Sequence, residues 1–189
     1  MAQSHQELFG GAITVKIPSE FADVSNIRQV PDNQEVFLDV NGFSSLTFDL
    51  TERVTQFATD KEALEYHFSD ILAEGDSKQV WSIHDQVELP KFPSKTPALC
   101  LVATTAPPAT VSLRPNEPTH TDVQLTLIRL LEQNTDFVVT LNVPCVPSEI
   151  ADSEGTAESR RQKVVQKMSE ICKNILRSLE IKDWSLFGA

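Results

Sequence analysis

Hydrophobic and polar residues alternate along several stretches in the first half of the chain. Residues 12–17 read Ala-Ile-Thr-Val-Lys-Ile and are followed by a proline, so they predict a strand that stops there. Residues 34–40 predict a second strand, and the Asn-Gly pair that follows predicts a turn at its end. Residues 46–50 read Leu-Thr-Phe-Asp-Leu and predict a third, half-buried strand.

The end of this third strand carries two acidic residues. We predict that the strand stops near Leu50 or Thr51, because continued strand geometry would point Glu52 to the same face as Leu50, into the core. A turn at that point would place Asp49 and Glu52 on one outward face. Two neighbouring carboxylates repel each other slightly, so stability does not explain the pair.

Two stretches follow the helical period instead. Thr59 and Glu62 form a capping-box pattern ahead of an apolar stripe that includes Leu64 and Phe68, and Gly75 suits the stop. Residues 157–179 predict a long final helix. Its stripe, which we expect to pack against a sheet, consists of Val164, Met168, Ile171, Ile175 and Leu179.

The remaining apolar stretches predict strands over residues 79–89, 97–106, 121–133 and 135–144, with a hairpin at Asn134-Thr135. The Pro-rich residues 106–120 predict a mobile loop. The order of strands and helices is not a repeating βα unit. It therefore predicts an α+β fold with a largely antiparallel sheet.

The size and composition of the chain fit one domain. It has 189 residues, of which 40 % are hydrophobic, enough for a sizeable core. No apolar run approaches the length of a membrane span, and the N-terminus lacks the pattern of a secretory signal. The three cysteines are odd in number and widely spaced, which favours a reducing compartment.

The net charge of −11 is unevenly distributed. Residues 1–90 contain 16 Asp and Glu against 5 Lys and Arg, whereas residues 91–189 contain 11 of each kind. An acidic surface argues against nucleic acid and favours a basic protein partner. A solubility charge without any partner remains the alternative interpretation.

Catalytic patterns are lacking in the sequence. The four histidines and three cysteines have no metal-ligand spacing, and there is no Gly-x-Ser-x-Gly and no nucleotide-binding loop. We expect His67 to be structural, and Trp81 and Trp184 to be core anchors. The chain is therefore expected not to be an enzyme, and no cofactor is implied.

Several short stretches together resemble the Ran guanine nucleotide release factor family. They are LFGGAIT (8–14), PDNQEV (31–36), DLTERV (49–54), LIRLLEQNTDFVVTLNVP (127–144) and SLF (185–187). Their order and spacing carry the resemblance, which spans nearly the whole chain.

The resemblance implies a PsbP-like fold, with an antiparallel sheet of about six strands flanked by helices on both faces. It also implies binding to the small GTPase Ran and release of its guanine nucleotide, in the nucleus and also in the cytoplasm. The acidic positions of the family's D-L-x-E segment fall on Asp49 and Glu52, and the matching turn adds Asp32 and Glu35 as candidates for the same Ran-binding surface. We expect a monomer without a membrane or nucleic-acid partner.

Two other function classes remain open at this point. One is an adaptor that binds Ran through the same acidic face without exchange activity. The other is a ligand-binding or hydrolytic α+β enzyme, which would need a deep pocket lined by convergent polar groups.

Overall fold

The computed structural model describes residues 2–25, 27–85, 87–114, 116–147 and 156–188. The strands are β1 (Gln3–Leu8), β2 (Ile13–Pro18), β3 (Phe21–Asp23), β4 (Gln34–Asp39), β5 (Ser45–Glu52), β6 (Ser77–His84), β7 (Ala98–Ala106), β8 (His120–Leu130), β9 (Thr135–Cys145) and β10 (Glu180–Ile181). The helices are α1 (Asp60–Asp70) and α3 (Ala157–Ser178), with short 3-10 turns η1 (Phe9–Gly11) and η2 (Trp184–Phe187).

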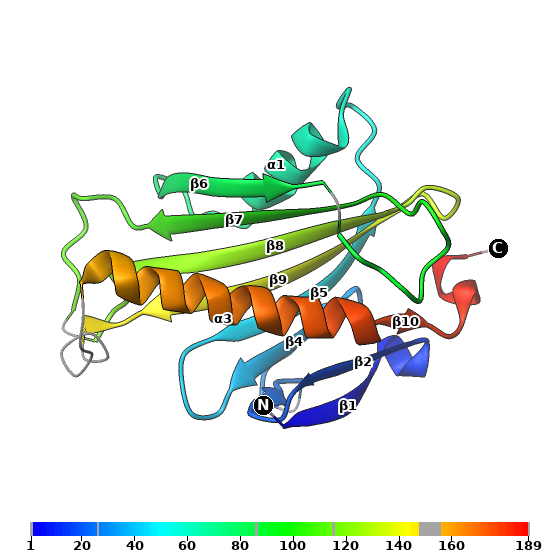
Figure 1. Cartoon of the computed structure of the whole chain (residues 1–189), viewed down its shortest axis with the longest axis horizontal. Coiled ribbons are helices and arrows are strands. Elements are labelled where there is room, and N and C mark those ends of the chain that lie inside the picture. The colour runs from blue at the N-terminus through cyan, green and yellow to red at the C-terminus, as the bar shows by residue number, and fades with distance from the viewer. Residues whose placement is uncertain (1, 26, 86, 115, 148–155, 189) are drawn as a thin grey trace.

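The main sheet has seven strands in the order β3-β4-β5-β9-β8-β7-β6, and every neighbouring pair is antiparallel. It consists of two meanders, β3-β4-β5 and β6-β7-β8-β9, which the pairing of β5 with β9 joins (Figure 1). The predicted α+β class and antiparallel sheet are confirmed. A second sheet, β1-β2-β10, was not predicted as a separate unit.

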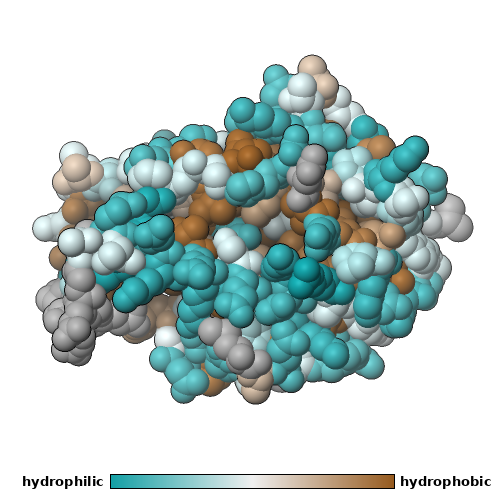
Figure 2. Space-filling view, viewed as in Figure 1, coloured by the Kyte–Doolittle hydropathy of each residue, from teal (hydrophilic) through white to brown (hydrophobic). Residues whose placement is uncertain are grey.

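Helices cover both faces of the main sheet, as predicted. Helix α3 crosses one face in front of β8 and β9, and the small sheet lies beside it, whereas α1 packs behind β7 and β8 (Figure 1). In the view of Figure 2, hydrophilic residues dominate over α3 and the small sheet, and hydrophobic residues gather in a band between α3 and β6.

Each face of the main sheet has its own core. The α3 side buries residues of β2, β4, β5, β9 and α3, including Phe48 and Phe137. Met168, Ile171, Ile175 and Leu179 of the predicted helical stripe are all buried there, which confirms that stripe as core. The α1 side has a smaller core, built around Leu64, Phe68 and the facing residues of β7 and β8.

The predicted capping box at the start of α1 is present in the structure, but the predicted burial of the two tryptophans is not. Thr59 and Glu62 form both hydrogen bonds of the capping box. Trp81 and Trp184 are 41 % and 36 % exposed, so their prediction as core anchors is wrong. Trp81 lies on the edge strand β6 and stacks under the guanidinium of Arg161 at 3.3 Å, and Trp184 lies in the terminal turn η2.

Candidate functional site

Three segments far apart in the sequence meet around one hollow of about 380 Å³, which we call the acidic hollow. It is lined by Phe9, Gly10, Asp23, Ser25, Val30, Pro31, Asp32, Gln34, Glu35, Val36 and Leu186. The structure therefore brings two predicted site residues, Asp32 and Glu35, beside the LFGGAIT and SLF stretches. Asp23, which the sequence reasoning missed, adds a third carboxylate to the lining.

Glu35 shapes one wall of the acidic hollow. Its carboxylate accepts a hydrogen bond from the backbone N–H of Phe9 at 2.7 Å. Phe9, Gly10 and Gly11 all have positive φ values, of 51°, 67° and 92°, and glycine adopts such angles without the steric cost that other residues meet. Glu35 thus satisfies an N–H at the start of a left-handed turn, and it has a structural role besides its predicted one.

Asp32 occupies the turn that leads into β4 and is exposed. The N–H of Gln34 closes this turn onto the carbonyl of Pro31 at 2.9 Å. Asn33 then ties the turn to β5, because its carbonyl accepts the N–H of Leu50 at 2.9 Å and its amide donates to the carbonyl of Leu50 at 3.1 Å. This tie lies one residue from Asp32 and two from Glu52.

The predicted corner at the end of β5 is wrong. The strand continues through Glu52, which pairs with Thr135 at the start of β9. Asp49 and Glu52 are three residues apart in a strand, so they point to opposite faces of the sheet. Glu52 shares the α3-side face with Phe48 and Leu50, but it stands at the very end of the sheet and is exposed, so no buried charge forces the strand to stop.

Asp49 faces the α1 side and lies in a smaller hollow of about 200 Å³, which we call the sheet hollow. Its lining is Arg28, Gln34, Val36, Thr47, Asp49, Ile71, Thr140 and Asn142. Burial raises the pKa of Asp49 to about 6, although a hydrogen bond from Gln34 and the nearby His67 act in the opposite direction. The structure thus divides the four predicted residues between the turn, the α3-side face and the α1-side face.

A buried ion cluster lies next to the sheet hollow. Asp136, fully buried, receives hydrogen bonds from the Nε of Arg129 at 3.0 Å and pairs with the Nε2 of His67 at 2.9 Å. The Nη1 of Arg129 also donates to Asp60 at 2.7 Å. Burial alone would raise the pKa of Asp136, but the bonds from His67, Val54 and Arg129 outweigh burial and lower it. The expectation that His67 is structural is consistent with this position.

The ion cluster fixes the segment that follows Glu52. Asp136 accepts the backbone N–H of Val54 at 3.1 Å, and Arg129 donates to the carbonyl of the same residue. Arg53 N–H bonds the carbonyl of Asn134 at 2.9 Å. The sequence reasoning missed this cluster, although a charged residue inside the apolar run Leu-Ile-Arg-Leu-Leu was a usable signal.

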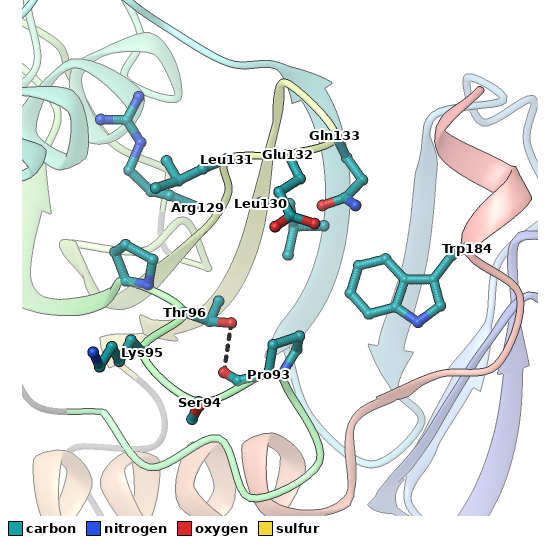
Figure 3. A pocket seen from close by; sticks show the side chains of 11 residues that line it. Pro93, Ser94, Lys95, Thr96, Arg129, Leu130, Leu131, Glu132, Gln133 and Trp184 are labelled. Carbon is teal, nitrogen blue, oxygen red and sulfur yellow. Dashed lines mark hydrogen bonds between the residues drawn. The ribbon is translucent and has the colours of Figure 1, made fainter. Parts of the chain in front are cut away.

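A further hollow, of about 390 Å³, lies between residues 93–97, the β8–β9 turn and Trp184. Figure 3 shows the indole of Trp184 across from the side chain of Gln133, while Arg129 points away toward α1. The Thr96 hydroxyl donates to the carbonyl of Pro93 at 2.9 Å on the other side (Figure 3). None of the four predicted site residues lines this hollow.

The described residues lack two features that would point to other functions. No group of three or more His, Cys, Asp and Glu side chains among the described residues is arranged to hold a metal ion. In the same residues, no helix is long and apolar enough to cross a membrane. The acidic side chains at the start of β4 and the end of β5 are placed to attract positively charged groups.

The arrangement of the main sheet, the small sheet and helices α1 and α3 is a known α+β fold. The crystal structure of the Ran-binding protein Mog1p of Saccharomyces cerevisiae superposes with a TM-score of 0.73, at 24 % identity and over 100 % of both chains. At this identity the likeness shows the fold alone.

Sequence comparison gives the family. The sequence profile described as Ran-interacting Mog1 protein matches residues 6–144, and the chain belongs to this family. The Ran guanine nucleotide release factor of Danio rerio is 29 % identical over 96 % of this chain and 98 % of its own length. The protein of the same name in Homo sapiens is 32 % identical over 72 % of this chain and 74 % of its own. The family resemblance expected from the five stretches is confirmed.

Proposed function

We propose that this protein binds the small GTPase Ran and promotes release of its bound guanine nucleotide, in support of nucleocytoplasmic protein transport. The observation that carries this proposal is the gathering of exposed and half-buried carboxylates at one end of β4 and β5, in a chain of the Ran-interacting Mog1 family. Relatives named Ran guanine nucleotide release factor support the choice of partner and activity.

The carboxylates at the start of β4 and the end of β5 attract a positively charged partner as it approaches. The whole excess of negative charge lies in residues 1–90, the part of the chain that includes β4, β5 and their turn. Charges of one sign on one region steer a partner of the opposite sign and raise its association rate. Asp32 and Glu52 serve this role best, since both are exposed.

Release of nucleotide follows from thermodynamic linkage. A protein that binds the nucleotide-free GTPase more tightly than the loaded form must weaken nucleotide binding by the same factor. Carboxylates do this by attracting basic residues that otherwise hold phosphate, or by disturbing the magnesium ion of the GTPase. The protein acts by binding, as a monomer, without covalent chemistry or a cofactor of its own, in the nucleus and the cytoplasm.

The test is loss of labelled guanine nucleotide from purified Ran, followed with and without this protein. We expect faster release with the wild type and a reduced effect with Asp32→Lys and with Glu52→Lys. Asp85→Lys is the matched control, because Asp85 is an exposed acid just after β6, at the opposite edge of the sheet.

Two results would change the proposal. Ran that binds the wild type without any faster loss of nucleotide would identify a non-exchanging adaptor. Equal loss of effect in the control and in the two site variants would mean that only the total charge matters.

A further inference from the structure

Part of the α1-side face of the main sheet forms the floor of the sheet hollow. Helix α1 packs on β7 and β8, and the same face of β4 and β5 opens into the sheet hollow. The strand register places Thr47 between Val36 and Thr140 in one cross-strand row, and Asp49 beside Gln34 in the next. These side chains stand on one face of three adjacent strands and form the floor of the hollow.

Two polar groups of this floor keep unused hydrogen-bonding capacity in the folded protein. Thr140 is only 3 % exposed, and its hydroxyl has no hydrogen-bond partner among the described residues. Asp49 forms no ion pair among them, although Arg28 also lines the hollow and His67 lies near enough to act on its charge. A buried hydroxyl without a partner destabilises a protein, so an external hydrogen-bond partner for Thr140 would remove a real cost. The Asp49 carboxylate already has a hydrogen bond from Gln34, but it can accept more than one.

The border of the hollow is apolar and exposed. Ile71, which follows the last turn of α1, lines the hollow and is 46 % exposed. Leu38 stands two residues beyond Val36 on the same face of β4 and is 42 % exposed. Exposed apolar side chains that lie close together provide the apolar area on which a protein partner can pack.

The size of the hollow decides the class of its occupant. A volume of about 200 Å³ lies below the range of roughly 300–1,000 Å³ that small-molecule sites occupy. One side chain of another protein fits such a space, with its apolar part against Ile71 and Val36. Its tip must donate at least one hydrogen bond, because the Asp49 carboxylate only accepts, whereas the Thr140 hydroxyl can accept or donate.

We infer that this face, with Thr140 and Asp49 at its floor and Leu38 and Ile71 at its border, is the surface on which the GTPase docks. This inference rests on the proposed function and assigns Thr140 and Leu38 as contact residues that no motif indicated. It also separates the roles of the carboxylates: Asp49 contacts the partner directly, whereas Glu35, on the other face, holds the turn at Phe9.

Thr140→Val tests the floor, because valine has the same shape without the hydroxyl. The free protein loses no hydrogen bond, so its melting temperature should stay unchanged or rise. Affinity for Ran, measured by calorimetry, should fall about tenfold, which corresponds to about 1.4 kcal/mol. A purely structural role of Thr140 would produce the opposite pattern.

Leu38→Gln tests the border, with Val80→Gln as the matched control. Both residues are 42 % exposed and lie on strands, but Val80 belongs to β6 at the far edge of the sheet. We expect weaker Ran binding for Leu38→Gln alone. Wild-type affinity in both Thr140→Val and Leu38→Gln would overturn the docking surface and leave the proposed function intact. Failure of the wild type itself to bind Ran would instead overturn the proposed function.

Discussion

Two carboxylates on neighbouring strands of the same sheet face have opposite surroundings. Asp136 of β9 pairs across the sheet with Thr51, so it lies diagonally next to Asp49 of β5. Asp136 has bonds from Arg129, His67 and the N–H of Val54, and its pKa is lowered. Asp49 lies in a hollow, and burial raises its pKa to about 6. Folding satisfies the first carboxylate and leaves the second available to a partner.

Removing the charge of Asp136 should have the largest effect on stability. Asp136→Asn leaves the buried Arg129 with Asp60 as its one counter-ion among the described residues, and we expect a loss of about 3–5 kcal/mol in the free energy of unfolding at pH 7. Urea titration measures it, with Asp85→Asn as the exposed control. A group with a lowered pKa stabilises above its unfolded pKa, so the difference should shrink as the pH falls below about 4. A loss of less than about 1 kcal/mol in the free energy of unfolding would show that the Asp136 carboxylate stabilises the fold no more than Asp49 does.

The matching change at Asp49 should have the opposite sign. Asp49→Asn removes a charge that burial disfavours, so we expect a gain of about 1–2 kcal/mol at pH 7 to 8, after allowance for solvent screening. The sign follows from the raised pKa: the contribution of Asp49 to stability is complete below pH 4 and is lost as the pH rises through 6. Thermal melts across this range, combined with Ran titrations, should show a more stable protein that binds more weakly. Destabilisation at pH 8 would refute this picture.

Glu35 and Asp32 extend the comparison to the acidic hollow. Glu35→Ala leaves the N–H of Phe9 without its partner and should cost about 1 kcal/mol of stability. Asp32→Ala, at an exposed turn, should stay within about 0.5 kcal/mol of wild type. Denaturant titration of both variants measures the two losses of stability and shows whether Glu35 supports the fold more than Asp32 does. Equal losses would show that the turn depends on Asp32 as well.

Glu52 should have the smallest effect on stability and a clear effect on the encounter with Ran. Glu52→Lys, at the exposed end of β5, should change the free energy of unfolding by less than about 0.5 kcal/mol. Its association with Ran, followed by stopped flow, should slow. For the wild type, the association rate should fall as salt rises, because exposed charges are screened over about 8 Å at physiological ionic strength. A rate independent of salt would leave the net charge of −11 as a solubility feature.

The elements with strong local signals were predictable. The capping box at Thr59, the alternation in residues 46–50 and the stripe around Ile175 each reflect contacts within one element. The short strands β1, β3 and β10 were not predicted, because Gln3–Leu8 is mostly polar and the other two have only three and two residues. Such strands exist because a neighbour pairs with them, which no local pattern records.

The candidate site was predictable only in part. Acidic residues in the turn and at the end of β5 were evident in the sequence, but the face that each occupies was not. The end of β5 depends on its pairing with β9, a partner far along the chain, so the expected corner at Leu50 was wrong. Thr140 gave no signal, because its position in the sheet hollow follows from the register of three strands. The mobility of residues 106–120 and the single-domain organisation stay predictions.

The seam between the two meanders has a consequence for the folding pathway. Ser45 lies beside Asn142, 97 positions later in the chain, and their side chains share a hydrogen bond. Contacts of such long sequence separation form slowly, because a large loop must close before they bring any gain. The β6–β9 meander, whose neighbouring strands are closer in sequence, can assemble earlier, and β3-β4-β5 then docks onto β9. Thr47 and Thr140 face each other across this seam, so the sheet hollow is completed late in folding and is among the first regions to open in the native state. A partner that binds residues of both β5 and β9 would oppose this opening, and amide hydrogen exchange in β5 would become slower.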